Sequence, residues 1–264
     1  MPRMRLDQLL VERRLASSRS QAQALILAGE VELRGAGTRT LKPGQQVAAD
    51  ASVSLVGKPR WASRAGAKLD AALGAFAIDP TGLACLDAGA STGGFTDVLL
   101  EGGARIVYAV DVGRAQLVDR LRRDPRVVSM ERTNLRTLDA LPEPVDLVTL
   151  DLSFISLALV LPAVHRLLTD AGRAVCLVKP QFEAGRDAVP RGGVVRDSAV
   201  HRDVLLRFGD HAVAAGFVPT RLIRSPVTGS DGNVEFLALL EKSVATRRDW
   251  AALVEPVVAG DRAV

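Results

Sequence analysis

Residues 85–100 read CLDAGASTGGFTDVLL, in which three glycines surround Ser91 and Thr92 directly after an apolar run. An acidic residue, Asp87, interrupts that run just before the first glycine. Glycines permit a tight turn and let backbone N–H groups come close to a ligand. The start of a helix is a favourable place for such contacts. The stretch therefore predicts a ligand-binding loop that leads from a strand into a helix.

Short apolar runs alternate with amphipathic segments from Gly82 onward, a pattern typical of a doubly wound parallel sheet. The runs read as strands are ACLD (84–87), IVYAVD (106–111), RVVSM (126–130), VDLVTLDL (145–152), RAVCLVKP (173–180), TRLIRSP (220–226) and VEFLALLE (234–241). A hairpin-like connection, VTGSDGN, joins the last two runs, so the final strand should run antiparallel. We expect an α/β, Rossmann-like domain whose seven-stranded sheet is otherwise parallel.

Charged residues close several of these runs, namely Asp87, Asp111, Asp151 and Lys179. In parallel sheets, ligands bind at the carboxyl ends of the strands, so these side chains should face one crevice. Asp111 ends the strand after the glycine loop, where a carboxylate can accept ribose hydroxyls. A nicotinamide-dependent dehydrogenase would use similar residues. Its G-x-G-x-x-G spacing is absent from GASTGG, which disfavours that class.

The N-terminal 60 residues contain ten Lys or Arg against five Asp or Glu, a net charge of +5 in a chain whose total is +4. Leucines at helical spacing predict a helix over residues 5–15. Ser18 with Gln21 fits the capping box of a second helix, and Gly29 is placed to end it in a left-handed cap. A strand at 30–33 and a turn-rich segment follow. An excess of positive charge on a small module favours an anionic partner.

Two short helices and a small hairpin of this kind resemble the S4 RNA-binding domain, over residues 3 to about 56. The resemblance implies that Arg5, Arg19, Ser20 and Gln21 face RNA phosphates, and an arginine fork can meet two phosphate oxygens at once. The other cations that we predict to contact RNA are Arg13, Arg14, Lys42, Arg64, Arg186 and Arg191. The last two lie in a glycine-rich basic segment, 184–198, which fits an RNA-contacting lid and a plain exposed loop equally well.

The glycine loop resembles the S-adenosylmethionine loop of class I methyltransferases. Lys68, Asp151, Lys179 and Glu235, in this order, resemble the charged set of 2′-O-ribose methyltransferases related to FtsJ. Together with the S4-like module, the stretches VSMERTN, DLSFISL, VKPQFE and SDGNVE resemble the TlyA (haemolysin A) family over residues 3–242. That resemblance implies an S-adenosylmethionine-dependent methyltransferase acting on cytidines of 16S ribosomal RNA, 23S ribosomal RNA or both, with ribosomal subunits as partners.

The resemblance also implies site residues. The four charged residues would be catalytic, with Lys179 taking or polarising the proton of the 2′-hydroxyl and Asp151 and Glu235 holding the lysines. A free lysine has a pKa near 10.4, so Lys179 would need Lys68 nearby to lower it. Residues expected to bind the cofactor are Asp87, Gly89, Ala90, Ser91, Thr92, Gly93, Gly94, Phe95, Asp111, Val112, Asn134 and Asp151.

Other features limit the alternatives. The histidines have no carboxylate or cysteine at ligand spacing, so no metal is expected. Cys85 and Cys176 lie in apolar runs and should be buried thiols. No apolar stretch reaches membrane-spanning length, which argues against a membrane-active haemolysin and favours a cytoplasmic protein. A non-catalytic RNA-binding assembly factor remains the other alternative, and the oligomeric state stays open, a monomer included.

The predicted organisation is an S4-like domain over 1–56, a linker over 57–63, a methyltransferase domain over 64–242 and a tail over 243–264. Trp250, Leu253, Val254 and Val257 have the spacing of an amphipathic helix, which we expect to pack on the large domain.

Overall fold

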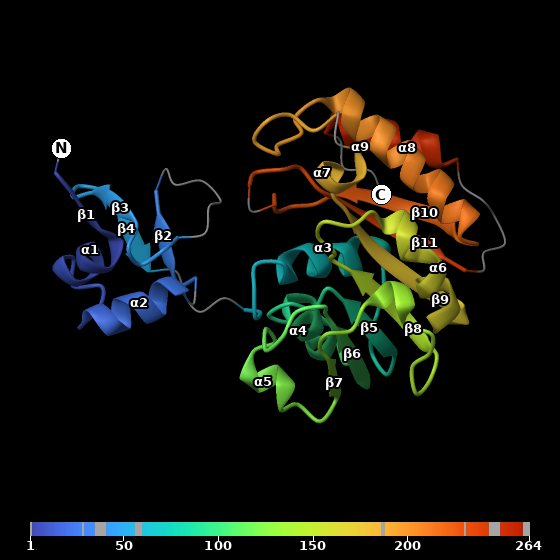
Figure 1. Ribbon diagram of the computed structural model, residues 1–264, viewed down its shortest axis with the longest axis horizontal. Coiled ribbons are helices and arrows are strands. Elements are labelled where there is room, and N and C mark those ends of the chain that lie inside the picture. The colour runs from blue at the N-terminus through green and yellow to red at the C-terminus, as the bar shows by residue number, and fades with distance from the viewer. Residues whose placement is uncertain are drawn as a thin grey trace. The chain divides into compact units, whose positions relative to one another are not determined.

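The computed structural model describes residues 2–27, 29–34, 41–55, 60–185, 188–229, 231–242 and 249–260. The chain divides into two compact units, with the main boundary between Arg60 and Trp61 (Figure 1). Each unit has a hydrophobic core of its own. Arg186 and residues 57–59 of the expected linker lie outside the described residues.

The second unit is built on a seven-stranded sheet in the order β10-β11-β9-β8-β5-β6-β7. Its strands are β5 (Ala84–Ala88), β6 (Ile106–Val110), β7 (Val127–Met130), β8 (Val145–Leu150), β9 (Leu168–Val178), β10 (Val218–Arg224) and β11 (Phe236–Glu241). Strands β5 to β9 are parallel, whereas β11 runs antiparallel to both β9 and β10. The predicted fold class and the antiparallel last strand are confirmed. β9 begins earlier than its apolar run suggested.

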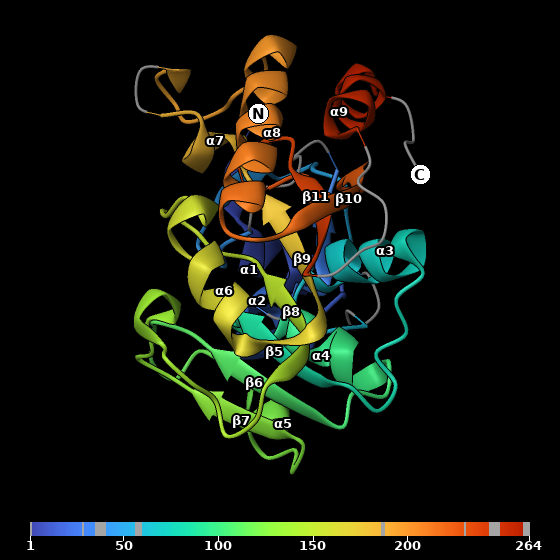
Figure 2. The ribbon, with the colours of Figure 1, turned by 90° about the vertical axis from the view of Figure 1, so that its right-hand side faces the viewer.

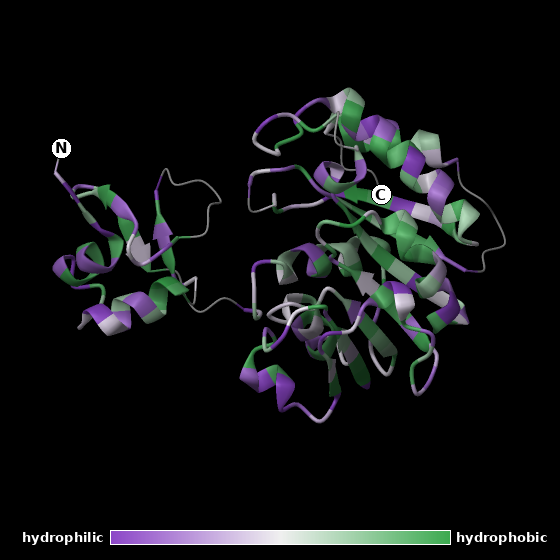
Figure 3. Ribbon diagram, viewed as in Figure 1, coloured by the Kyte–Doolittle hydropathy of each residue, from purple (hydrophilic) through white to green (hydrophobic). Residues whose placement is uncertain are grey.

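Helices cover both faces of this sheet (Figure 2). They are α3 (Gly66–Phe76), α4 (Gly94–Glu101), α5 (Asp119–Arg122), α6 (Leu161–Leu167), α7 (Pro180–Glu183), α8 (Ser198–Ala214) and α9 (Trp250–Ala259), with 3-10 turns η1 (Leu135–Thr137) and η2 (Leu157–Leu159). Alternate residues of each strand belong to two separate cores. In β5, for example, Leu86 belongs to the core that includes residues of α6 and α8, whereas Cys85 belongs to the core that includes residues of α3 and α4. The central strands β5, β6 and β8 are accordingly mostly hydrophobic, whereas α5 is mostly hydrophilic (Figure 3).

The tail helix packs as expected. Val254 and Val257 of α9 are fully buried in the core beside α8, and the Trp250 indole donates a hydrogen bond of 2.8 Å to the carbonyl of Leu205. Both cysteines are buried and free, as predicted. Among the residues that the structure describes, no helix combines the length and apolarity needed to cross a bilayer.

The first unit comprises β1 (Arg3–Arg5), α1 (Leu6–Glu12), α2 (Arg19–Leu27), β2 (Val31–Leu33), β3 (Gln46–Ala48) and β4 (Val53–Leu55). β1 pairs with β3 and β2 with β4, both antiparallel. The first helix is shorter than predicted, because Arg5 ends a strand and Arg14 adopts a left-handed conformation with φ of 58°.

The second helix of this unit, α2, starts and ends close to the predicted positions. Ser18 Oγ accepts from the backbone of Gln21, but the Gln21 side chain accepts from Ser17 rather than closing the capping box on Ser18. Gly29 has the predicted left-handed φ, 73°.

Candidate active site

The glycine loop lies between β5 and α4, and its glycines are required by close contacts as well as by conformation. Gly89 has φ of 82°, and a Cβ there would lie 2.5 Å from the carbonyl oxygen of Asp151. Gly93 has φ of 98° and is packed against Leu117 and Leu121. The loop therefore runs directly against the end of β8 and cannot accept side chains at these positions.

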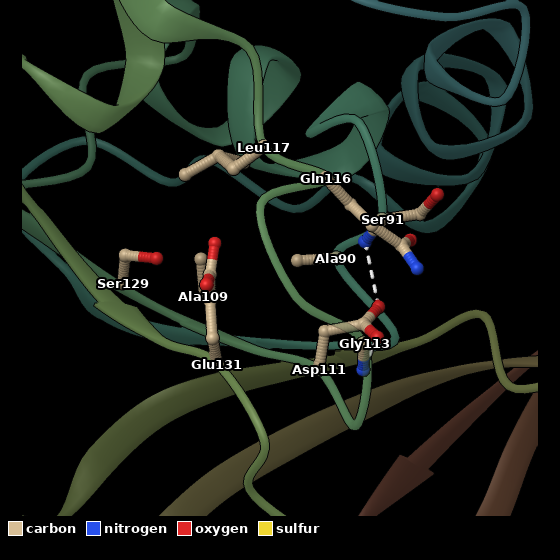
Figure 4. A pocket seen from close by; sticks show the side chains of 9 residues that line it. All are labelled: Ala90, Ser91, Ala109, Asp111, Gly113, Gln116, Leu117, Ser129 and Glu131. Atoms are coloured by element: carbon tan, nitrogen blue, oxygen red, sulfur yellow. Dashed lines mark hydrogen bonds between the residues drawn. The ribbon is translucent and has the colours of Figure 1, made fainter.

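Asp111 fastens this loop at the end of β6. Its carboxylate accepts the backbone N–H of Ser91 at 2.8 Å and that of Gly113 at 2.6 Å. Figure 4 shows the Asp111 carboxylate pointing to the Ser91 backbone at the edge of a pocket. The pocket is lined by Ala90, Ser91, Ala109, Asp111, Gly113, Gln116, Leu117, Ser129 and Glu131. One side-chain oxygen of Glu131 is buried and has no hydrogen-bond partner among the described residues.

Four predicted catalytic residues form two ion pairs. Lys68 on α3 pairs with Glu235, Nζ to Oε2 2.5 Å, and both side chains are at least nine-tenths buried. Lys179 pairs with Asp151, Nζ to Oδ1 2.6 Å.

The sheet brings these residues to one edge. Asp151 directly follows β8, Lys179 directly follows β9, and Glu235 directly precedes β11. β11 is antiparallel and aligns Phe236 with Val178, so its start meets the end of β9. Each lysine is thereby matched by a carboxylate from a different element.

Aromatic side chains adjoin the second pair. The Lys179 ammonium donates to Ser153 Oγ at 3.2 Å and lies 5.8 Å from the ring centroid of Phe182. The Phe182 ring packs on that of Phe154, with the two centroids 4.9 Å apart. Phe154 is 90% exposed and has a positive φ of 62°. The exposed Phe154 ring therefore lies close to the nearly buried Lys179, with Phe182 in contact with both.

Asp87 lies inside the fold rather than at the rim. Its side chain is fully buried and accepts from the hydroxyls of Thr96 at 2.7 Å and Thr149 at 3.3 Å. Burial raises the pKa of Asp87 from 3.8 to about 7, opposed by the Thr96 hydrogen bond and reinforced by the charge of Asp151. This placement corrects the expectation that the Asp87 side chain faces the crevice, whereas its assignment to the cofactor stays a prediction.

The remaining predicted cofactor residues separate into three groups. Phe95 is 2% exposed within the core, and its assignment as a cofactor contact stays a prediction. Val112 is 72% exposed beside the pocket, and the Asn134 side chain caps η1 by accepting from the N–H of Arg136. Thr92, Gly93 and Gly94 belong to the loop but do not line the pocket.

The predicted RNA contacts lie mainly on the first unit. Arg5, Arg19, Ser20, Gln21 and Lys42 are at least partly exposed there. Arg13 donates to the carbonyl of Ala49, and Arg14 is exposed. On the second unit, Arg64 and Arg191 are exposed.

The segment that contains Arg191 is anchored by the buried Asn233. This side chain accepts from the N–H of Val195 and donates to the carbonyl of Gly193, both at 2.9 Å. These hydrogen bonds attach the segment to Asn233, which lies two residues before Glu235 in the sequence. Of the described residues, no group of three His, Cys, Asp or Glu could hold a metal ion.

Two protein-family models match the sequence of this chain. The family model described as FtsJ-like methyltransferase matches residues 61–242, the greater part of the chain. The chain belongs to the FtsJ-like methyltransferase family. An S4 domain model matches residues 4–35, within the first unit.

The similarity to several known proteins extends over nearly the whole chain. The 16S/23S rRNA (cytidine-2′-O)-methyltransferase TlyA of Mycobacterium tuberculosis is 47% identical, with 90% of each chain covered. Hemolysin A of Brachyspira hyodysenteriae is 39% identical, with 89% of this chain and 98% of the relative covered. A solved protein of Streptococcus thermophilus whose name calls it a hemolysin has a TM-score of 0.77 and 44% identity, with 98% and 96% of the chains covered.

Sequence reasoning did not select six residues of the pocket: Ala109, Gly113, Gln116, Leu117, Ser129 and Glu131. A signal for Glu131 was present, because it follows the apolar run 126–130 as Asp111 closes the run before it. The other five lie within a loop or a strand, where nothing in their spacing distinguishes them.

Proposed function

We propose that this protein transfers a methyl group from S-adenosylmethionine to the 2′-hydroxyl of a cytidine in ribosomal RNA. The observation that supports the proposal best is the pair of ion pairs, Lys68–Glu235 and Lys179–Asp151, at the sheet edge where the glycine loop meets β8. The related Mycobacterium tuberculosis protein is named for this reaction on 16S and 23S rRNA. A ribosomal RNA substrate implies action in the cytoplasm.

The pocket of Figure 4 fits the nucleoside part of S-adenosylmethionine. Ala90 and Ser91 of the glycine loop line this pocket, and the buried oxygen of Glu131 is an acceptor without a donor among the described residues. Asp111 and Glu131 would hold the ribose hydroxyls and the base, with Ala90 and Leu117 as apolar walls. When bound, the cofactor supplies an electrophilic methyl group on a sulfonium.

Lys179 is the residue that we assign to the 2′-hydroxyl. Its ammonium is nearly buried and fixed by Asp151 and Ser153, so a hydroxyl brought to it is met by a group that needs little reordering. Methyl transfer to the 2′-oxygen would release the hydroxyl proton. The Asp151 carboxylate would take this proton directly, or would accept one from Lys179 as the lysine nitrogen takes the proton of the hydroxyl. Lys68 and Glu235 fix α3 against the same edge.

The exposed Phe154 ring is the group that we assign to the target base. A stacked base gains roughly 1–3 kcal/mol from an aromatic side chain. Phe154 sits on Phe182, over which the Lys179 ammonium lies, so a base on this ring would bring its ribose near the lysine.

Replacement of Lys179 by alanine tests the assignment. The loss of a positioned proton acceptor lowers the rate roughly 10²–10⁴-fold, so Lys179→Ala should abolish methylation while RNA binding persists. Lys242→Ala is the matched control, since Lys242 has a partner in Asp170 but lies at the opposite end of β9 and β11.

The assay is transfer of labelled methyl to purified ribosomal RNA, followed by mass spectrometric mapping of 2′-O-methylcytidine. Near-normal single-turnover transfer by Lys179→Ala would remove the lysine from the reaction. Absence of 2′-O-methylcytidine with the unaltered protein would disprove the proposed function.

A further inference from the structure

The first unit contains a fully buried carboxylate, Asp7, in the first turn of α1. Arg5 approaches it with two N–H groups, Nε to Oδ1 at 3.0 Å and Nη2 to Oδ2 at 2.8 Å. Arg19 adds a longer contact from α2, Nη2 to Oδ2 at 3.4 Å, and Gln23 donates at 3.0 Å. Residues from β1 and α2 thus converge on one acidic group.

This arrangement keeps Asp7 ionised. The Arg5 hydrogen bonds, above all, hold the pKa of Asp7 well below its usual range, against the opposing effect of burial. A buried charge is tolerated only when it is paired and hydrogen-bonded, so the carboxylate fixes its partners as firmly as they fix it.

The arginines keep most of their donors after binding Asp7. A guanidinium has five N–H groups in a rigid plane, of which Arg5 uses two here and Arg19 one. Their side chains remain 38% and 53% exposed. The Arg5 guanidinium also lies against Gly44, where a Cβ would be 3.3 Å from Nη1, next to the turn that contains the exposed Lys42.

We infer that Asp7 is a positioning residue of the RNA-binding surface, which holds Arg5 and Arg19 in a fixed arrangement with free N–H groups available to phosphate oxygens. The inference rests on the proposed RNA substrate. Binding that must immobilise long side chains is weakened by the entropy lost, and an arginine already held by a carboxylate avoids most of that loss. The single negative charge of Asp7 leaves the two arginines with a net positive charge.

The substitution Asp7→Asn distinguishes the effect of arginine positioning on RNA affinity from the effect of net charge. The substitution raises the formal net charge of the chain from +4 to +5, which by charge alone should strengthen RNA binding. Loss of positioning should instead weaken binding by about tenfold, if roughly one to two side chains must be ordered anew. The measurement is a titration of the full-length protein with a fluorescein-labelled 30-nucleotide RNA hairpin at several salt concentrations.

Val47→Ala is the matched control, because Val47 is a buried residue in the hydrophobic core of the same unit and makes none of the hydrogen bonds described for Asp7. Amide NMR spectra verify that the first unit of each variant is folded. Affinity equal to or above that of the unaltered protein, or a loss no larger than that of Val47→Ala, would overturn the role of Asp7. If the unaltered protein itself fails to bind the hairpin in a salt-dependent way, the RNA substrate is refuted instead.

A second measurement needs no variant. NMR relaxation of the arginine Nε–H groups in the free full-length protein should show Arg5 to be ordered relative to the exposed Arg14. Equal mobility of the two would also overturn the inference, even if Asp7→Asn did not fold.

Discussion

Asp87→Asn is expected to stabilise the second unit above neutral pH. The carboxyl group of Asp87 is fully buried between two threonine hydroxyls, and burial raises its pKa from 3.8 to about 7. In the unfolded chain the group ionises near 3.8, so unfolding is accompanied by proton release over this interval. The asparagine amide has the same shape but does not ionise in either state, so Asp87→Asn removes this pH-dependent contribution to the unfolding free energy.

The sign and size follow from the two pKa values. Below 3.8 both states are protonated and Asp87 favours neither. As the pH rises towards 7, only the unfolded state ionises, so the folded state loses about 1.4 kcal/mol per pH unit, or about 4 kcal/mol in total. The amide costs about 1 kcal/mol in a rearranged hydrogen bond to Thr149. The advantage of Asp87→Asn should therefore grow by about 2–3 kcal/mol between pH 5 and pH 8.

Tryptophan fluorescence during urea unfolding is a suitable assay. The chain has two tryptophans, Trp61 and Trp250, and both belong to the second unit, so the signal reports that unit alone. Asp210→Asn, an exposed carboxylate on α8, is the control and should give a difference that does not vary with pH. A pH-independent difference for Asp87→Asn would show that the buried carboxyl titrates as an ordinary one and would refute the reasoning.

Three further outcomes are expected. Glu235→Gln should lower the unfolding free energy by roughly 3–5 kcal/mol in the same urea assay, because it leaves the buried Lys68 ammonium unpaired; a loss below about 1 kcal/mol would mean that water reaches the lysine. Gly89→Ala should abolish S-adenosylmethionine binding in calorimetry, because the added Cβ would collide with the Asp151 carbonyl and displace the loop. Gly82→Ala is the control and should bind the cofactor normally, since Gly82 has a similar φ but no described atom lies within 4 Å of the added Cβ. Phe154→Ala should change stability by less than about 0.5 kcal/mol yet reduce RNA methylation about tenfold or more, and unchanged methylation would exclude the ring as a stacking platform.

Local pattern predicted the strands and their common edge because the side chains involved obey short-range rules. Apolar runs of strand length identified all seven strands of the sheet, and the hairpin-like connection before Glu235 predicted the reversed last strand. A charged residue directly after such a run must lie at a strand end, so Asp151 and Lys179 could be assigned to one edge from sequence order alone.

The sequence by itself determined the fold class, the glycine loop and the group of charges at the sheet edge, since each depends on periodicity or on neighbours along the chain. Only the tertiary structure decided how those charges pair, because the partners of Lys68 and Lys179 come from distant elements. It also decided that Asp87 is interior and Asp111 exposed to the pocket, although both are acids near the ends of apolar runs. The difference arises because Asp87 lies within β5, a central strand covered on both faces, whereas Asp111 lies just past the end of its strand. Burial is a property of the packed layers, and no local pattern of residues records it.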